Sequence, residues 1–388
     1  MAKGLLILAF GAPYAKRHRL TGWINVPDAE AGETGPIVLH GARSSHENRP
    51  TKAGLEGGER MLELAQSLSS KDLLICLISG GGSALWPAPV KDVTLADKQT
   101  VTDLLLASGA TIHEMNAVRK HLSRVKGGGL VKATKARIVT LIISDVIGDR
   151  LDVIASGPTA PDPSTYQDAI QILKTYKLQK RVPPSVRKHL ERGASGKLPE
   201  TLKEPDPRVT NVILGNNRLA LESARDEAQR RNYVSFMTSN IHGESRGLGI
   251  ALADLARTIR DEMKTPKGSV CLLAGGETTV ALPKHHGKGG RNQEIVLSAL
   301  AHLGPQNFQD IAVLSAGTDG EDGPTDAAGA FMDEAIAKQA KPAEIHKRLE
   351  RHDAYPYLDK LKALFRTGPT GTNVNDMFAI AVDLAEES

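Results

Sequence analysis

Basic and acidic side chains suited to phosphate chemistry follow one another between positions 114 and 149. The segment EMNAVRKHLSRVKGGGL places Arg119 and Lys126 before three glycines, and the apolar run IVTLII then leads into SDVIGD, which supplies Asp145 and Asp149. Lysine and arginine can hold phosphate oxygens, whereas a carboxylate can bind a divalent metal or accept a hydroxyl proton. This combination indicates phosphoryl transfer.

A predicted helix over 112–125 would present these cations on one face. Its polar and basic residues recur every three or four positions, namely Asn116, Arg119, Ser123 and Lys126. No acidic residue lies among them, so an anionic ligand would supply the missing charge. A solvated helix face is the alternative. Gly127 and Gly128 favour the ligand because they let the chain approach it closely.

A glycine-rich loop follows the apolar run LLICLI. Its sequence SGGGSAL allows several backbone N–H groups to turn toward one anion, and its residues are Ser79, Gly80, Gly81, Gly82 and Ser83. The loop has neither the Walker spacing nor the G-x-G-x-x-G spacing of dinucleotide sites. The alternative is a turn that lets a helix pack closely on a strand. We interpret the loop as a candidate phosphate-binding loop.

Polar loops in the C-terminal third supply a second set of candidates. GKGGRNQE places Arg291 behind two glycines at a predicted helix start, where a guanidinium can bind phosphate or carboxylate. TDGEDGPTD is rich in acids, but its spacing does not match a calcium-binding EF-hand. A second acidic lobe and a set of tight turns are both compatible with it.

Short apolar runs alternate with amphipathic stretches, which predicts an α/β fold. The predicted strands are 4–10, 73–78, 138–143, 211–215, 270–275 and 311–317. The predicted helices are 55–68, 95–107, 112–125, 219–230, 248–263 and 292–303. Because the strands are apolar throughout, we expect a mostly parallel sheet that is buried on both faces. Ligands bind at the carboxyl ends of such strands, where this chain repeatedly carries glycine and polar residues.

The length and composition of the chain favour some classes of protein and argue against others. The chain has 388 residues, of which 40% are hydrophobic, and this length favours two domains. The net charge of +4 and the aromatic content of 4% argue against a nucleic-acid partner. Cys76 and Cys271 lie in apolar runs and are predicted to be buried thiols. No run approaches the ~20 apolar residues of a membrane span, and we expect a cytoplasmic protein, with the mitochondrion as the alternative.

Eight motifs, taken in order, resemble those of the glycerate 2-kinase family with its C-terminal MOFRL domain. They are SGGGSAL, EMNAVRKHLSRVKGGGL, LIISDVIGD, IASGPTAPDP, GGETTV, GKGGRNQE, GTDGEDGPTDAAGA and GPTGTNVND. The resemblance implies a Rossmann-like N-terminal domain over 1–264, a smaller α/β domain over 265–388, and an active site in the cleft between them. It also implies phosphorylation of D-glycerate at the 2-hydroxyl from ATP with Mg²⁺. A homodimer is one option that the sequence leaves open.

Residue by residue, the resemblance implies that Asp145, Arg291 and Lys126 are catalytic. Asp145 and Asp319 are the predicted metal ligands. The predicted nucleotide-binding residues are Ser79, Gly80, Gly81, Gly82, Ser83, Asn116, Arg119, Ser123, Gly127, Gly128, Asn216, Glu277, Thr278, Asp319, Thr372 and Asn373.

One family motif is not matched. Relatives carry an upstream strand that runs into Gly-Lys-Ala, whose lysine is a catalytic candidate, whereas AKG at 2–4 has a different order and Lys3 is a poor substitute. An isoform that binds nucleotide and glycerate with impaired catalysis is therefore one alternative. A hydroxypyruvate reductase using NAD(P)H is another, although the missing dinucleotide fingerprint argues against it.

Overall fold

The structure is a computed structural model that describes residues 16–44, 49–263 and 268–384. The predicted strand over 4–10 lies outside these residues. The chain forms two compact units, one built from 1–142 and 149–214 and the other from 143–148 and 215–388. The chain passes from the first unit to the second between Leu214 and Gly215, about 50 residues before the domain boundary expected at 264/265. These units are defined by contacts, so the domain boundary at 264/265 stays a prediction.

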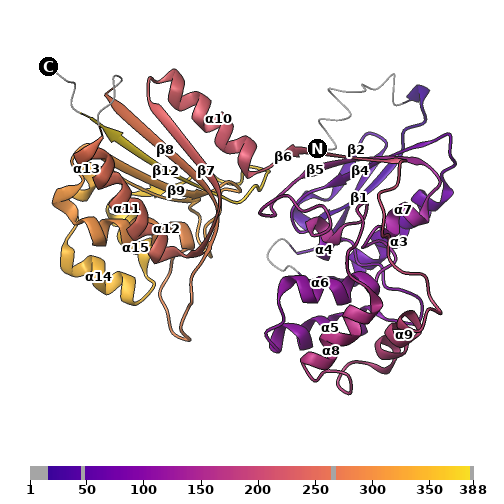
Figure 1. The fold of residues 1–388 in the computed structure, drawn as a ribbon. Helices are drawn as coiled ribbons and strands as arrows, with labels where there is room; N and C mark the ends of the chain where they lie inside the picture. Colours follow the sequence, from indigo (N-terminus) through magenta and orange to yellow (C-terminus); the bar gives the residue numbers. More distant parts are fainter. Residues whose placement is uncertain (1–15, 45–48, 264–267, 385–388) are drawn as a thin grey trace. The chain divides into compact units, whose positions relative to one another are not determined.

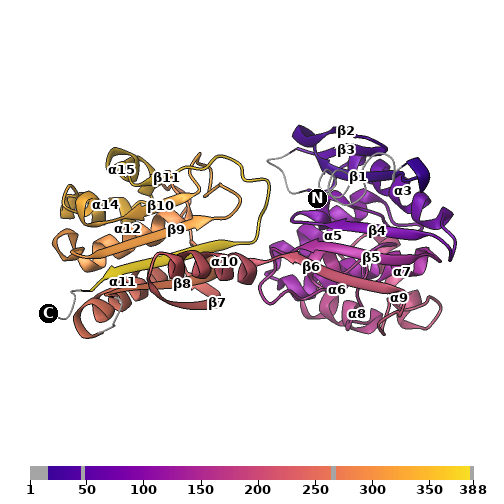
Figure 2. The same cartoon turned by 90° about the horizontal axis from the view of Figure 1, so that it is seen from above.

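The N-terminal unit contains two three-stranded sheets, which Figure 2 shows next to each other. The first has the order β1-β3-β2, with β1 (Gly22–Pro27) parallel to β3 (Ile37–Arg43) and β2 (Gly32–Thr34) antiparallel to it. The second has the order β4-β5-β6, made of β4 (Leu73–Ile78), β5 (Arg137–Ile143) and β6 (Val209–Gly215). β4 and β5 are parallel, so both carry their following loops at the same edge of the sheet.

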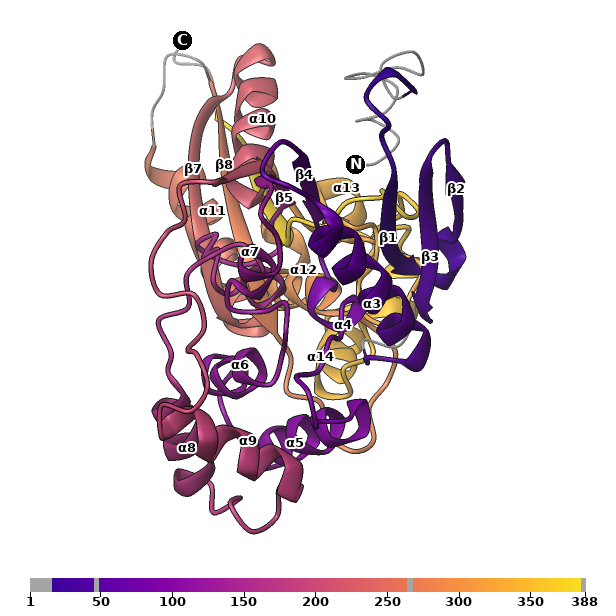
Figure 3. The same ribbon diagram turned by 90° about the vertical axis from the view of Figure 1, so that its right-hand side faces the viewer.

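Helices of this unit begin at recognisable caps. Capping boxes start α5 at Thr94, α6 at Thr111 and α8 at Thr165. In each, the threonine hydroxyl accepts the backbone N–H of an acid three residues later, and the carboxylate of that acid accepts the backbone N–H of the threonine. The helices are α3 (Lys52–Ser67), α4 (Gly82–Leu85), α5 (Leu95–Ala107), α6 (Ile112–His121), α7 (Gly129–Ala133), α8 (Tyr166–Thr175) and α9 (Pro184–Ala194). Figure 3 shows α5, α8 and α9 gathered away from the strands, where they share an apolar core with α6.

The C-terminal unit is built on one six-stranded mixed sheet of order β11-β10-β9-β12-β8-β7. Its strands are β7 (Val234–Glu244), β8 (Ser269–Thr279), β9 (Ile311–Gly317), β10 (Gly329–Met332), β11 (Leu364–Phe365) and β12 (Asp376–Asp383). Only β7 and β8 pair in parallel; β8–β12, β12–β9, β9–β10 and β10–β11 are antiparallel.

Helices cover both faces of this sheet. They are α10 (Asn217–Arg230), α11 (Ser245–Glu262), α12 (Arg291–Leu303), α13 (Glu334–Ala337), α14 (Pro342–Glu350) and α15 (Ala354–Lys360). Alternate residues of β8 and β12 face opposite sides, as a strand requires. Val270 and Phe378 pack into the core with α11 and α12, whereas Cys271 and Leu273 pack against Leu221 of α10 on the other face (Figure 1).

The predicted α/β class is confirmed, and both cysteines are buried as expected. Three predictions were wrong in part. The sheet of the C-terminal unit is not mostly parallel, because β12 lies between β8 and β9 and pairs antiparallel with both. The helix expected over 112–125 ends at His121, because the chain turns there and Ser123 forms an isolated antiparallel β-bridge with Pro89. β6 is not buried on both faces, since Val212 and Leu214 are exposed. No helix of the described chain is both long and apolar enough to cross a membrane.

Candidate functional site

The glycine-rich loop lies where β4 ends and presents unpaired backbone donors. Gly81 adopts a φ of +75°, which turns the chain sharply into the short helix α4. Across the described residues, no hydrogen bond uses the backbone N–H of Gly80, Gly81 or Ser83. Free N–H groups that converge in a tight turn bind anions. The loop therefore offers the donors that the sequence predicted.

Two cations meet at Ser83. The guanidinium of Arg119 donates to Ser83 Oγ at 2.7 Å, and the ammonium of Lys126 donates to the same oxygen at 2.8 Å and to Ser83 O at 3.1 Å. Neither cation has a carboxylate partner among the described ion pairs, although Lys126 is only 3% exposed. They converge even though Lys126 lies beyond the end of α6, so a shared helical face is not what brings them together.

Lys98 is a further cation, with a buried ammonium group, that was not predicted from the sequence. Its Nζ is buried and has no hydrogen-bond partner in the described chain. Burial, with the charges of Arg119 and Arg124 adding, lowers the pKa of Lys98 to about 7. Burial, Arg119 and Lys98 likewise lower the pKa of Lys126. The signal was present in the sequence, because Lys98 lies three residues before Val101 on the buried face of α5, where lysine is rare.

Ser156, in the motif IASGPTAPDP, is also close to this group, although it was not among the predicted catalytic or nucleotide-binding residues. It ends the 3₁₀ turn Ile154–Ser156, in which Ala155 and Ser156 have positive φ values of 49° and 63°. Such strain in residues other than glycine persists where the surroundings hold it, often at functional sites. Ser156 Oγ lies 3.1 Å from Ser83 Oγ and donates to Asn116 Oδ1 at 3.5 Å.

The other residues predicted here have local structural roles. Gly127 and Gly128 have positive φ, and their N–H groups donate to Ser156 O at 3.0 Å and Gly157 O at 2.7 Å. Their amides are thus used within the protein. Ser123 Oγ accepts from the N–H of Lys126 at 3.3 Å and shapes the turn after α6.

In the C-terminal unit, Arg291 is held by two acids at the start of α12. Its Nε and Nη2 donate to Asp376 at 2.6 and 3.0 Å, and its Nη1 donates to Glu277 at 2.7 Å. Asp376 is fully buried, so the bidentate pair fixes the guanidinium. Asp376 was not predicted from the sequence, because it lies 85 residues from Arg291 along the chain.

Two of the predicted acids, Asp145 and Asp319, belong to the same unit as Arg291. Burial, with the charge of Glu277 adding, raises the pKa of Asp145. Asp319 lies in a neighbouring loop, where its carboxylate accepts from the N–H of Glu321 at 3.0 Å and from Asn373 Nδ2 at 3.1 Å. Within the described ranges, no three His, Cys, Asp or Glu side chains are grouped to hold a metal ion.

Three predicted nucleotide-binding residues make local contacts in this unit. Asn216 caps α10 by accepting from the N–H of Leu219 at 2.8 Å. Thr278 is 1% exposed and its hydroxyl lies 2.9 Å from that of Ser245. The N–H of Thr372 donates to Thr370 Oγ1 at 3.4 Å. None of these contacts joins them to Arg291.

The close packing at the start of α12 leads to a first prediction. Asp322 is 2% exposed and accepts the N–H groups of Asn292 and Gln293 at 3.0 and 2.9 Å. A methyl group at Gly290 would overlap its carboxyl group. We expect Gly290→Ala to lower the free energy of unfolding by about 1–3 kcal/mol, as overpacking does. Urea unfolding measures this change.

Gly247→Ala is the matched control, because its methyl group would meet only Glu244 at 3.9 Å. Gly247 lies in the first turn of α11, where alanine is favoured over glycine. This variant should be as stable as the unmodified protein or slightly more stable. Equal stability of Gly290→Ala and Gly247→Ala would show that the carboxyl group of Asp322 is not held firmly.

The chain is a two-unit α/β protein with one group of polar residues around Ser83 and another around Arg291. Comparison with known proteins identifies its family. Residues 4–191 match a family described as a domain of unknown function (DUF4147), and residues 270–376 match the MOFRL family. Glycerate 2-kinase of Pyrococcus horikoshii is 43% identical over 84% of this chain and 74% of that protein. Human glycerate kinase is 38% identical over 93% of this chain and 79% of that protein.

A solved structure agrees. The crystal structure of glycerate kinase from Thermotoga maritima superposes with a TM-score of 0.84 at 36% identity, covering 94% of this chain and 85% of that one. The chain belongs to the glycerate 2-kinase family.

Proposed function

We propose that this protein is a glycerate 2-kinase, which transfers the γ-phosphoryl group of ATP to the 2-hydroxyl of D-glycerate. The observation that supports this most is the cation cluster, which we define as Lys98, Arg119 and Lys126. It lies in the same unit as the unpaired N–H groups of the glycine-rich loop and has no carboxylate to balance it among the described ion pairs. Buried cations of one sign are costly unless an anion joins them.

In the proposed reaction, the 2-hydroxyl oxygen of glycerate forms a bond to the γ-phosphorus. The bond between that phosphorus and the bridging oxygen breaks, and ADP leaves. Arg119 and Lys126 are the groups that we assign to the negative charge of the phosphoryl oxygens. Asp145 is our candidate for accepting the hydroxyl proton, because a raised pKa suits a general base. Arg291, implied by the resemblance, is fixed by Asp376 and Glu277.

Mg²⁺ is part of the proposal, and the acids present are compatible with it. Mg²⁺ commonly takes one or two carboxylates and completes its shell with water and substrate phosphates. Asp145 and Glu277 fit this pattern, because they lie close enough for the charge of Glu277 to raise the pKa of Asp145. Holding the metal would be an alternative to the base role of Asp145, since a bound cation lowers the pKa of a carboxylate. When bound, the ion would neutralise charge on the nucleotide phosphates. Asp319 is the second predicted ligand.

A coupled assay for ADP release in the presence of D-glycerate, ATP and Mg²⁺ tests the proposal. We expect ADP formation that requires glycerate. The assay is repeated with NADH or NADPH and hydroxypyruvate. Oxidation of the nicotinamide would favour the reductase. Binding of both ATP and glycerate without ADP formation would instead favour the binding isoform.

A further inference from the structure

A small cavity in the N-terminal unit has no function assigned to it so far. Its volume is about 180 Å³, and the polar residues that line it are His113, Asn116, Lys120, Arg150, Asp152, Asp162 and Ser164. Pockets for drug-sized ligands hold about 300–1,000 Å³. The cavity is therefore suited to a molecule much smaller than a nucleotide.

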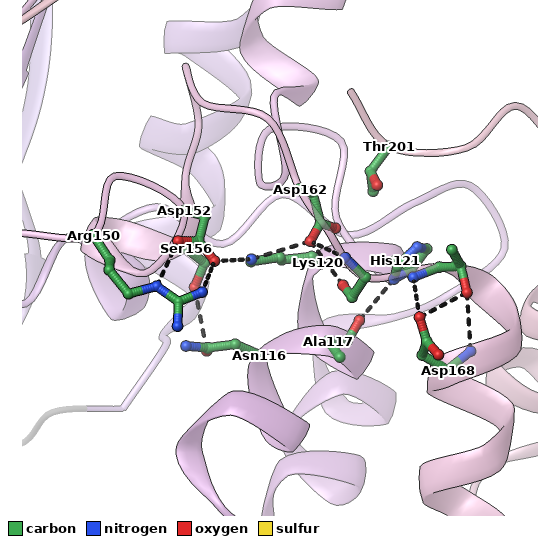
Figure 4. Close-up of polar contacts among 12 residues, drawn as sticks. Asn116, Ala117, Lys120, His121, Arg150, Asp152, Ser156, Asp162, Asp168 and Thr201 are labelled. Atoms are coloured by element: carbon green, nitrogen blue, oxygen red, sulfur yellow. Dashed lines mark hydrogen bonds and ion pairs between the residues drawn. The ribbon is translucent and has the colours of Figure 1, made fainter. Parts of the chain in front are cut away.

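Ion pairs within the protein use the carboxylates on this lining. Lys120 is 4% exposed, and its ammonium lies 3.1 Å from Asp162 Oδ1 and 3.4 Å from Asp152 Oδ2. Arg150 binds Asp152 through Nε at 3.1 Å and Nη2 at 3.0 Å. Figure 4 shows this chain of contacts running from Arg150 to Asp162. Lys120 and Arg150 thus balance the charges of the two acids, while Asp162 Oδ2 is buried without a hydrogen-bond partner among the described residues.

Two donors on the lining have no protein partner. Asn116 is 5% exposed, and its Oδ1 accepts from Arg119 Nη1 at 3.4 Å and from Ser156 Oγ at 3.5 Å. Because these contacts take the oxygen, the amide nitrogen is left as a donor, and no described hydrogen bond uses it. Arg150 Nη1 is likewise unused among the described residues. Figure 4 shows both groups on the same side of the Lys120–Asp162 pair.

We propose that this cavity binds the carboxylate of a three-carbon hydroxy acid such as D-glycerate, with Asn116 Nδ2 and Arg150 Nη1 as donors. Arg150 carries a charge and is half exposed, whereas Asn116 is buried, so the two donors together can reach the carboxylate of a small molecule that enters the cavity. Asn116 also contacts Arg119 of the cation cluster, so only one side chain separates the cavity from that cluster. The proposal rests on the proposed function for the identity of the acid.

Direct binding of D-glycerate without ATP, measured by calorimetry, tests the cavity separately from catalysis. We expect Arg150→Ala to weaken glycerate binding by ~10-fold or more, because a charge-assisted hydrogen bond is lost. Asn116→Asp should weaken it further, since it places a carboxylate where the ligand carboxylate would lie. The affinity of Arg150→Ala for ATP should stay within about twofold.

Arg60→Ala is the matched control, because Arg60 is 55% exposed and pairs with Glu63, much as Arg150 is 52% exposed and pairs with Asp152. It should bind glycerate normally. Gluconate, a six-carbon acid, should not compete if the cavity sets the size limit. Unchanged glycerate affinity in both Arg150→Ala and Asn116→Asp would overturn the assignment. If glycerate binding depends on Arg150 but the protein releases no ADP, the proposed kinase function is contradicted and the assignment of the cavity stands.

Discussion

Replacing Lys126 with methionine is expected to lower kcat/KM for glycerate phosphorylation by ~10²–10³, as losing one preorganised charge donor does. Lys126 is the cation that contacts Ser83 through both its hydroxyl and its backbone oxygen. Methionine fills a similar volume without a charge. Steady-state kinetics with varied ATP measure the change.

Loss of folding would not explain this result. The pKa of Lys126 is lowered by burial, Arg119 and Lys98, so its charge is held at a cost and removing it should not lower the thermal midpoint. Lys135→Met removes an exposed lysine of the same unit and serves as the control. Full activity of Lys126→Met would exclude Lys126 from the proposed reaction.

Binding of a simple anion to the cation cluster should weaken as the pH rises above about 7. Lys98 has a pKa of about 7 in the free protein, whereas its ordinary value is near 10.4. A bound anion stabilises the ammonium and raises this pKa again. Between the two pKa values the site must take up a proton to bind, so the affinity falls by up to ~10-fold per pH unit for each proton taken up. Below about pH 7 Lys98 is already charged, so its own contribution to the slope should vanish there.

Sulfate is a suitable probe because its charge is constant over this range. The groups that act on Lys98 are Arg119, Arg124 and Lys126, all of them basic. Lys126 also has a lowered pKa and adds to the slope, so the comparison is made with Lys98→Met. The slope of log affinity against pH should be smaller by about one proton in that variant. Equal slopes would show that Lys98 does not titrate with anion binding.

Local patterns in the sequence predicted the framework of the molecule well. β4 and α5 occupy the predicted positions 73–78 and 95–107, since apolar runs and threonine caps are local signals. The glycine-rich loop and the convergence of Arg119 and Lys126 were also predicted. Ser83 explains that convergence, because both cations donate to it from segments 36 and 43 residues away.

Contacts between distant segments account for what was missed. Ser156 lies 73 residues from Ser83, and Asp376 lies 85 residues from Arg291. No local pattern marks either pairing. Lys98 differs, because its position on the apolar face of α5 can be recognised in the sequence. Its role in a cation cluster cannot be predicted in this way, since that role depends on which basic residues lie around it in the fold. The free donors at Asn116 and Arg150 likewise depend on which neighbouring groups are already paired.

The most direct test of the proposed function is ³¹P NMR of a mixture of this protein, D-glycerate, ATP and Mg²⁺. We predict that the γ-phosphate signal of ATP disappears while a phosphomonoester signal of 2-phosphoglycerate appears, with Lys126→Met showing neither change over the same time. Release of inorganic phosphate alone, formation of a different phosphoglycerate, or an unchanged spectrum with the unmodified protein would contradict the account.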